Sequence, residues 1–274
     1  MLRTARPTVS ARDVFVACCS TIADLSRKDR LSMNVENVET ASAAYANAGT
    51  DGNLSAFPIA AYRPIGMATS ADFEWLYEAR MVKSKPGRRY YELLRDANDE
   101  RCALCNVRPA TTLDHHLPKS TFAVLVVTPD NLIPACDTCN HTKLDSTAPT
   151  LNTYFDDLGS DSWLKARIIE GNPYVPEYFV DPLPVWPPEL ATRAQKHFEL
   201  FGLQKLYAAQ ANRYLAGIRL ILTGLHKRIG KGAVREHLQQ SAISYAAAEP
   251  NGWETAICLA AASSDWFCDK GFTY

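Results

Sequence analysis

Four cysteines in two Cys-x-x-Cys pairs are the residues of this chain with the clearest chemistry. The first pair is Cys102 and Cys105, and the second pair is Cys136 and Cys139. Each pair can place two thiolates on one metal ion, and two such pairs complete the tetrahedral four-thiolate set that zinc prefers. Two unrelated pairs of buried cysteines are the alternative, but paired two-residue spacing rarely arises by chance. The spacing therefore predicts one structural Zn²⁺ site.

A second group of polar residues lies between the cysteine pairs and directly after them: Asp114, His115, Asn131 and Asn140. Carboxylate and amide oxygens are the ligands that hard divalent cations prefer, and a neutral imidazole can accept a proton. His116 follows His115, and successive residues of a strand point to opposite faces, so the two imidazoles cannot share one role unless the backbone bends. A structural imidazole, bonded within the core, is the alternative role for either one.

The order and spacing of these residues resemble the HNH nuclease family over about residues 100–146. The matching segments are Asp114-His115-His116-Leu117-Pro118, Asn131-Leu132 and Cys136-x-x-Cys139-Asn140-x-x-Lys143. Asn140 stands where a histidine is commoner, a variation that the family accepts. The resemblance implies a ββα-metal core, with strands over 110–115 and 131–134 and a helix that begins near the second cysteine pair.

The same resemblance implies metal-dependent hydrolysis of phosphodiester bonds. Asp114 and Asn140 would hold Mg²⁺ or Mn²⁺, His115 would activate water, and Asn131 would hold the site loop and orient His115. DNA is favoured over RNA as the substrate because most relatives cut DNA. Members of the family often serve in restriction, mobile-element or phage-defence systems, sometimes beside an ATPase, which implies an ATPase or another defence protein as a partner.

Two other classes of protein also fit part of the pattern. A non-catalytic zinc-knuckle module that binds nucleic acid or protein needs only the four cysteines. It does not account for the Asp, His and Asn residues at matching positions. A four-cysteine redox switch is a third reading, and it is less favoured because closed four-thiolate coordination is usually inert.

The charge of the chain limits how it could bind nucleic acid. The 274 residues carry a net charge of −1, so any contact with phosphates must come from a local patch. Near the cysteine-framed core, the candidate phosphate contacts are Arg88, Arg89, Lys119 and Lys143. Residues 203–235 contain seven Lys and Arg and no acid, and here the candidates are Arg213, Arg219 and Lys227. A solvated helix face, or one that meets an acidic partner, is the alternative for this second group.

Hydrophobic periodicity and the positions of Gly and Pro predict a mainly α fold, with helical N-terminal and C-terminal flanks around the small core. The expected regions are 1–69 (helical), 70–150 (nuclease core) and 151–274 (Pro- and aromatic-rich connector, then helices). Two helices are expected within 11–50, and one within 70–101 that breaks at Pro86-Gly87. The connector should contain one or two short strands. The predicted C-terminal helices are 189–201, 203–229, 231–248 and 252–268.

The remaining features concern the cellular compartment. Cys18, Cys19, Cys258 and Cys268 show no disulfide pattern, and free thiols beside a zinc site are typical of a reducing compartment. No apolar run approaches the ~20 residues of a membrane span. Residues 1–12 are Arg-rich and faintly resemble a transit peptide, but a basic arm before the first helix is the preferred interpretation. These features predict a cytoplasmic protein.

Overall fold

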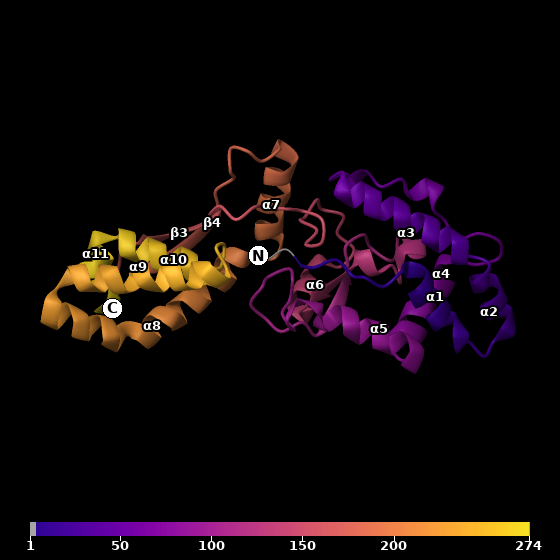
Figure 1. Cartoon of the computed structure of the whole chain (residues 1–274), viewed down its shortest axis with the longest axis horizontal. Helices are drawn as coiled ribbons and strands as arrows, with labels where there is room; N and C mark the ends of the chain where they lie inside the picture. The colour runs from indigo at the N-terminus through magenta and orange to yellow at the C-terminus, as the bar shows by residue number, and fades with distance from the viewer. Residues whose placement is uncertain (1–3, 274) are drawn as a thin grey trace. The chain divides into compact units, whose positions relative to one another are not determined.

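A computed structural model of the chain describes residues 4–273, so residues 1–3 of the basic arm lie outside the described range. The described residues are mainly helical, with eleven α-helices and two small antiparallel hairpins (Figure 1). They divide into two compact units, 4–157 and 158–273.

The N-terminal unit contains six α-helices, a π-helical turn and one hairpin. The α-helices are α1 (Ala11–Ser20), α2 (Leu25–Ser32), α3 (Val35–Thr50), α4 (Ser70–Leu76), α5 (Lys85–Arg95) and α6 (Asp137–Lys143). The π-helical turn Tyr77–Met81 continues directly from α4. The hairpin consists of β1 (Thr112–His115) and β2 (Leu132–Ala135).

The helix boundaries follow from local chemistry. The side chains of Ser10 and Asp24 accept hydrogen bonds from backbone N–H groups in the first turns of α1 and α2, as N-cap residues do. Pro86 lies in the first turn of α5, where its missing N–H costs nothing. The expected break at Pro86-Gly87 was therefore misplaced: the interruption lies at residues 82–84, and Pro86 helps to begin the next helix.

One hydrophobic core joins the first helices to the cysteine-framed segment. It includes Phe15 of α1, Tyr45 of α3, Phe73 of α4 and Leu132 of β2, each fully buried. The apolar run Phe122–Val127 also enters this core, as a loop with a short 3₁₀ turn rather than a strand. The regions that we expected to be separate, 1–69 and 70–150, are therefore packed together in one unit that extends to residue 157.

The C-terminal unit contains five helices and the second hairpin. The strands are β3 (Leu164–Ile169) and β4 (Val175–Val180), and the helices are α7 (Pro188–Leu200), α8 (Leu203–Ile229), α9 (Lys231–Ala248), α10 (Trp253–Ser263) and α11 (Asp265–Asp269). The first three of these helices match the expected ranges to within one residue. The expected helix 252–268 is divided at Ser264, because the side chain of Ser264 caps a new helix by accepting a hydrogen bond from the Phe267 N–H.

Candidate metal-binding and active site

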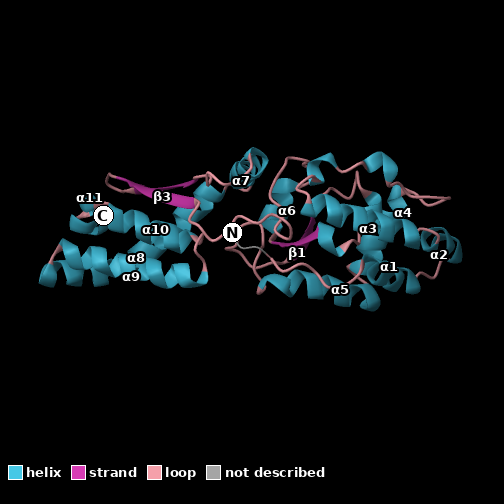
Figure 2. Ribbon diagram, turned by 45° about the horizontal axis from the view of Figure 1, so that its top comes forward, coloured by secondary structure: helices cyan, strands magenta, loops and turns pink. Residues whose placement is uncertain are grey.

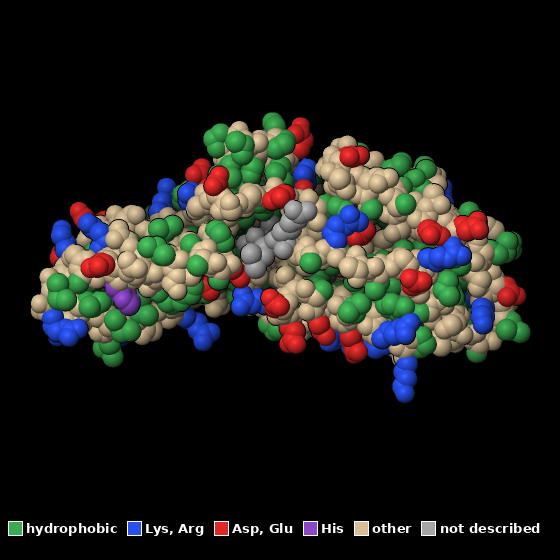
Figure 3. Space-filling view, in the orientation of Figure 1, with side chains coloured by type: hydrophobic (Ala, Val, Ile, Leu, Met, Phe, Trp, Pro, Cys, Tyr) green, Lys and Arg blue, Asp and Glu red, His purple; other side chains and the backbone are tan. Residues whose placement is uncertain are grey.

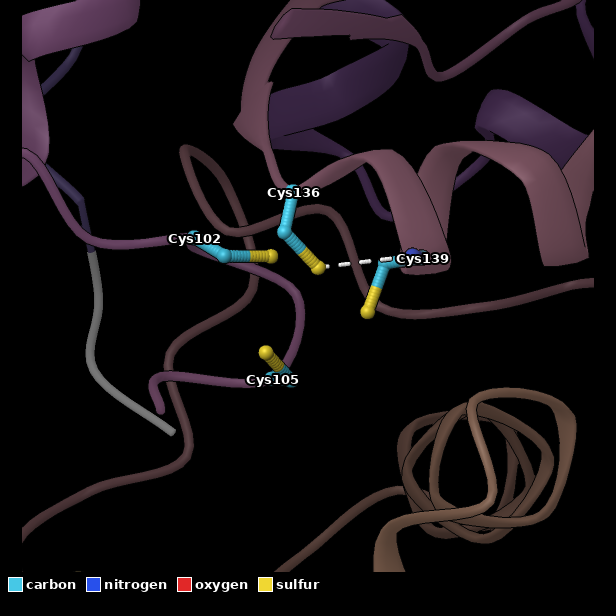
Figure 4. Close-up of side chains that lie close together, drawn as sticks. All are labelled: Cys102, Cys105, Cys136 and Cys139. Carbon is cyan, nitrogen blue, oxygen red and sulfur yellow. Dashed lines mark hydrogen bonds between the residues drawn. The ribbon is translucent and has the colours of Figure 1, made fainter. Parts of the chain in front are cut away.

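The four predicted zinc ligands lie together. Cys102 and Cys105 come from the loop before β1, Cys136 is the N-cap of α6, and Cys139 lies in its first turn (Figure 4). All four side chains are buried, and their Sγ atoms lie within 4.8 Å of one another. Four thiolates this close repel one another unless a cation holds them, and a soft-ligand set of this kind suits zinc. The cluster is therefore compatible with a structural Zn²⁺ site.

Local backbone geometry brings each cysteine pair together. In the first pair, Asn106 adopts a left-handed conformation (φ +53°) that Asn tolerates, and its N–H donates to the Cys102 carbonyl at 2.7 Å. In the second pair, the Cys139 N–H donates to the Cys136 Sγ at 3.4 Å, the bond drawn in Figure 4. The second cysteine pair therefore also caps helix α6.

Two antiparallel strands and helix α6 surround the other predicted site residues. In the β1–β2 pairing, Asp114 lies opposite Ile133 and His115 lies opposite Leu132. Helix α6 packs on β1, and Figure 2 shows β1 beside α6. The expected strands and helix are thus present, with each strand shifted by one or two residues from its expected start.

His115 is a buried imidazole held from two sides. Its Nε2 lies 2.9 Å from the carbonyl oxygen of Val126, and a carbonyl can only accept, so Nε2 carries the proton and Nδ1 is left as an acceptor. The ring of Tyr77 contacts the imidazole edge-on, with 4.6 Å between ring centroids. Burial lowers the pKa of His115 to about 4 because the low-dielectric surroundings disfavour the charged form. The imidazole is therefore neutral at physiological pH and can accept a proton.

Asn131 closes the loop between the two strands. Its Oδ1 accepts a hydrogen bond from the Leu117 N–H at 2.8 Å, and its Nδ2 donates to the carbonyls of Leu117 at 3.1 Å and Leu125 at 3.4 Å. The side chain is completely buried. These bonds hold the loop that supplies the Val126 carbonyl to His115.

We expect Asn131→Leu to lower the free energy of unfolding by roughly 2–5 kcal/mol. Loss of the Asn131 side-chain amide leaves the N–H and the carbonyl of Leu117 buried without partners. Each buried unsatisfied group costs about 1–3 kcal/mol. Urea unfolding followed by circular dichroism measures the change. Asn140→Leu is the matched control, because Asn140 is only half-buried and should cost less than about 1 kcal/mol. Equal losses in the two variants would contradict a special role for Asn131.

Asp114 forms a buried ion pair with Lys143. The Lys143 Nζ lies 3.2 Å from Asp114 Oδ2, and it donates to the His115 carbonyl at 2.6 Å. The Lys143 Nζ also donates to the other carboxylate oxygen, Oδ1, at 3.5 Å, whereas the buried Oδ2 has no hydrogen-bond partner among the described residues. Burial raises the pKa of Asp114, and the Lys143 ammonium opposes that effect. An acceptor-only oxygen of this kind suits a hard cation.

Lys143 occupies a different place from the one expected. Its side chain is only 2 % exposed, so a direct phosphate contact is not available to it in this structure. The ammonium group instead compensates the charge of Asp114. Without this lysine, an ionised carboxylate would be buried with no opposite charge beside it.

A cavity of 260 Å³ brings the predicted site residues onto one surface. Its lining includes Asp114 and His115 from β1, Asn140 and His141 from α6, and Lys119 from the loop after β1. The Asn140 Nδ2 donates to the Thr112 Oγ1 at 3.4 Å, which leaves the amide oxygen as the acceptor that a cation could use. His116 is not part of this lining, whereas His115 is.

Tyr77, Glu78 and Val126 contribute to the site, and the sequence did not point to them. Tyr77 packs on His115, Glu78 binds the Lys119 Nζ at 2.7 Å, and Val126 binds the imidazole. Tyr77 and Glu78 lie in the π-helical turn, and such turns are often found at functional sites. The nearest residues that the sequence singled out were Arg88 and Arg89, and they do not identify Tyr77 or Glu78.

The candidate phosphate contacts differ in how available they are. Lys119 is paired with Glu78 and Arg88 with Glu92. The exposed Arg89 stacks on Tyr90 and donates to its hydroxyl. On α8, the residues Arg213, Arg219 and Lys227 are exposed, and among the described residues none of them forms an ion pair. The edge formed by α8 in Figure 3 shows Lys and Arg side chains with no acidic ones between them.

Comparison with known proteins found one distant relative. The chain is 26 % identical over 223 residues to protein ea31 of Escherichia phage lambda, an alignment that covers 74 % of this chain and 75 % of that protein. No family model and no solved structure matched the chain. Across residues 4–273, the helices lack the combination of length and apolar character that crossing a membrane requires.

Proposed function

We propose that this chain is a metal-dependent HNH endonuclease that hydrolyses phosphodiester bonds, with a ββα-metal core formed by β1, β2 and α6. The observation that carries the proposal is the cavity onto which β1 and α6 bring a neutral imidazole, the Asp114 carboxyl group and the Asn140 amide. A zinc-knuckle module that only binds has no need for that arrangement.

In this proposal, His115 accepts the proton of the attacking water at Nδ1, while the Val126 carbonyl fixes the tautomer through Nε2. Asp114 and Asn140 hold Mg²⁺ or Mn²⁺ through oxygen. A cation there supplies Lewis-acid stabilisation of the charge that develops on the phosphate. Asn131 keeps the loop in place, and Tyr77 keeps the imidazole from turning.

The choice of DNA as the substrate rests on the same family resemblance. The proposed role in restriction or phage defence rests on that resemblance alone, since the relative from phage lambda carries no described activity in its name. Assistance from an ATPase or another defence protein stays a prediction.

Incubation with supercoiled plasmid tests the proposed activity. We expect nicked or linear product with Mg²⁺ or Mn²⁺ and none without added divalent cation. In Asp114→Asn, one carboxylate ligand is lost, and cleavage should require a divalent concentration about tenfold higher or more. The matched control is Asp145→Asn, which changes another carboxylate that lines the same cavity and accepts a hydrogen bond from Ser120. Absence of cleavage of both DNA and RNA under every cation condition would favour the binding module.

The basic residues of α8 lead to a separate expectation for DNA binding. If Arg213, Arg219 and Lys227 contact phosphates, replacing all three with Gln should weaken binding to unrelated DNA sequences equally. The slope of log affinity against log salt should become flatter by about 0.9 for each lost contact. Fluorescence anisotropy on labelled duplex measures both quantities. An unchanged salt slope would place the phosphate contacts elsewhere, with Arg89 as the next candidate.

A further inference from the structure

The β3–β4 hairpin leaves one of its two edges open. In an antiparallel pair, every second residue points its backbone N–H and C=O away from the partner strand. Three bonds identify these residues here: the Leu164 N–H donates to Asn251 Oδ1, the Tyr178 N–H donates to Gln204 Oε1, and the Pro176 carbonyl accepts from Gln204 Nε2. The even-numbered residues of both strands therefore direct their backbone groups outward.

Side chains cover part of these edges but not all of them. Asn251 covers β3 at Leu164, and Gln204 covers β4 at Pro176 and Tyr178. Ala166 and Ile168 lie between the strand ends, opposite Tyr178 and Pro176. Among the described residues, no hydrogen bond is formed by their outward N–H and C=O groups. Unpaired edge groups of this kind can pair with a further strand.

A groove runs along this open edge. Its volume is 680 Å³, and its walls come from β3 on one side and from α10 and α11 on the other. The α10 wall is mainly apolar, with Ala256, Leu259 and Ala260 beside Ser263. The groove also has two acids at its ends, Glu170 after β3 and Asp265 of α11, and Asp265 is paired with Arg235. Leu259 is 43 % exposed, so an apolar contact surface is available beside the unpaired backbone. In Figure 2, β3 runs alongside α10.

The charges along β3 indicate what chemistry a third strand would need. Lys165 and Arg167 project on the opposite face from Leu164, Ala166 and Ile168, because side chains alternate along a strand. On the β4 side, Arg167 already pairs with Glu177. A strand on the open side would meet Lys165 and Arg167 on that face and the apolar α10 wall on the other.

We propose that this groove binds an extended segment of another protein, in which apolar residues alternate with Asp or Glu, as a third strand on β3. Hydrogen bonds to the backbone N–H and C=O groups of Ala166 and Ile168 determine which residues of the segment lie opposite which residues of β3. Its apolar side chains face α10, and its acidic side chains lie beside Lys165 and Arg167.

A second copy of this chain fits the edge less well. A second copy would pair its β3 antiparallel with β3 of the first. In the register in which Arg167 of one copy faces Arg167 of the other, the two like charges lie directly opposite each other. In the register in which the two Ala166 residues face each other, Lys165 of each copy lies opposite Arg167 of the other. Like charges directly opposite each other destabilise a sheet. The register that places Ile168 opposite Ile168 avoids this repulsion, but it gives neither Lys165 nor Arg167 an acid opposite, so an acidic partner strand is the better occupant.

A fluorescent peptide of about eight residues that alternates Val and Glu is the probe, tested by anisotropy with the full-length chain. We expect saturable binding to the wild type, and at least about tenfold weaker binding to a peptide that alternates Val and Lys. Ile168→Pro removes an N–H that points into the groove and leaves the β3–β4 ladder unchanged. It should weaken binding of the acidic peptide about tenfold or more.

Two controls separate the backbone bond from other effects. Ile168→Ala keeps the N–H and should lose much less affinity than Ile168→Pro. Leu259→Glu changes the α10 wall without touching β3, and it should also weaken binding, which keeps the test valid if the proline variant fails to fold. Three results would overturn the proposal: no binding by the wild type, binding indifferent to Ile168→Pro and Leu259→Glu, or a wild-type dimer that Ile168→Pro dissociates.

Discussion

Replacing His115 with alanine is expected to reduce plasmid cleavage by about 10²–10⁴-fold, the usual contribution of a general base. The zinc content and the affinity for DNA should remain near those of the wild type, because the imidazole contacts neither the cysteine cluster nor the exposed basic residues. Single-turnover cleavage at saturating protein measures the chemical step apart from binding.

His116→Ala is the matched control, and it should cleave within a few-fold of the wild type. Its backbone N–H bonds to the Asn131 carbonyl, and the side-chain change leaves that bond in place. An inactive His116→Ala beside an active His115→Ala would mean that the two histidines have the opposite roles. Because the pKa of His115 is lowered to about 4, its neutral form persists below the range of an ordinary histidine. Wild-type cleavage should therefore not decline as the pH falls from about 7 to about 5.5.

Cys136→Ser should prevent the N-terminal unit from folding. A structural zinc site contributes about 10–16 kcal/mol of apparent binding free energy, which is as large as the whole stability of a typical domain. Cys136 also caps α6 through its Sγ. We therefore expect insoluble protein, or protein without zinc and without a cooperative melting transition.

Metal analysis and thermal melting measure these effects together. Cys258→Ser is the control, because this buried cysteine lies in the C-terminal unit and its thiol bonds, among the residues that the structure describes, to the Tyr214 hydroxyl. It should retain one zinc per chain and melt within a few degrees of the wild type. A folded wild-type protein that contains no zinc would contradict the assignment of the cluster.

The cysteine cluster could be predicted from the sequence because zinc imposes its own spacing on the ligands. Chemistry therefore determined which four of the eight cysteines meet, whatever the remainder of the fold. The long helices of the C-terminal unit were also predictable, since Gly202 and Gly230 lie at their boundaries and their apolar positions repeat regularly. Signals of this kind depend only on residues close together in the chain.

Contacts between distant residues could not be predicted in the same way. Tyr77 reaches His115 from a π-helical turn, and nothing in residues 77–81 distinguishes that turn from ordinary helix. Lys143 looked like a surface cation because its burial depends on Asp114, which lies 29 residues away. The shared core of the N-terminal unit was missed for the same reason, since its packing joins residues far apart in the chain.

Helix α6 is seven residues long, far too short to be stable alone. Its orientation is therefore fixed by contacts at its two ends, the cysteine cluster at the first turn and the Asp114–Lys143 ion pair at the last turn. Cys139 and Asn140 are neighbours in sequence, and successive helical residues are rotated by roughly 100°. Inserting one residue between them would keep every motif residue and still turn Asn140 away from the cavity. In this segment, the spacing between residues is therefore under tighter constraint than most of the residues themselves.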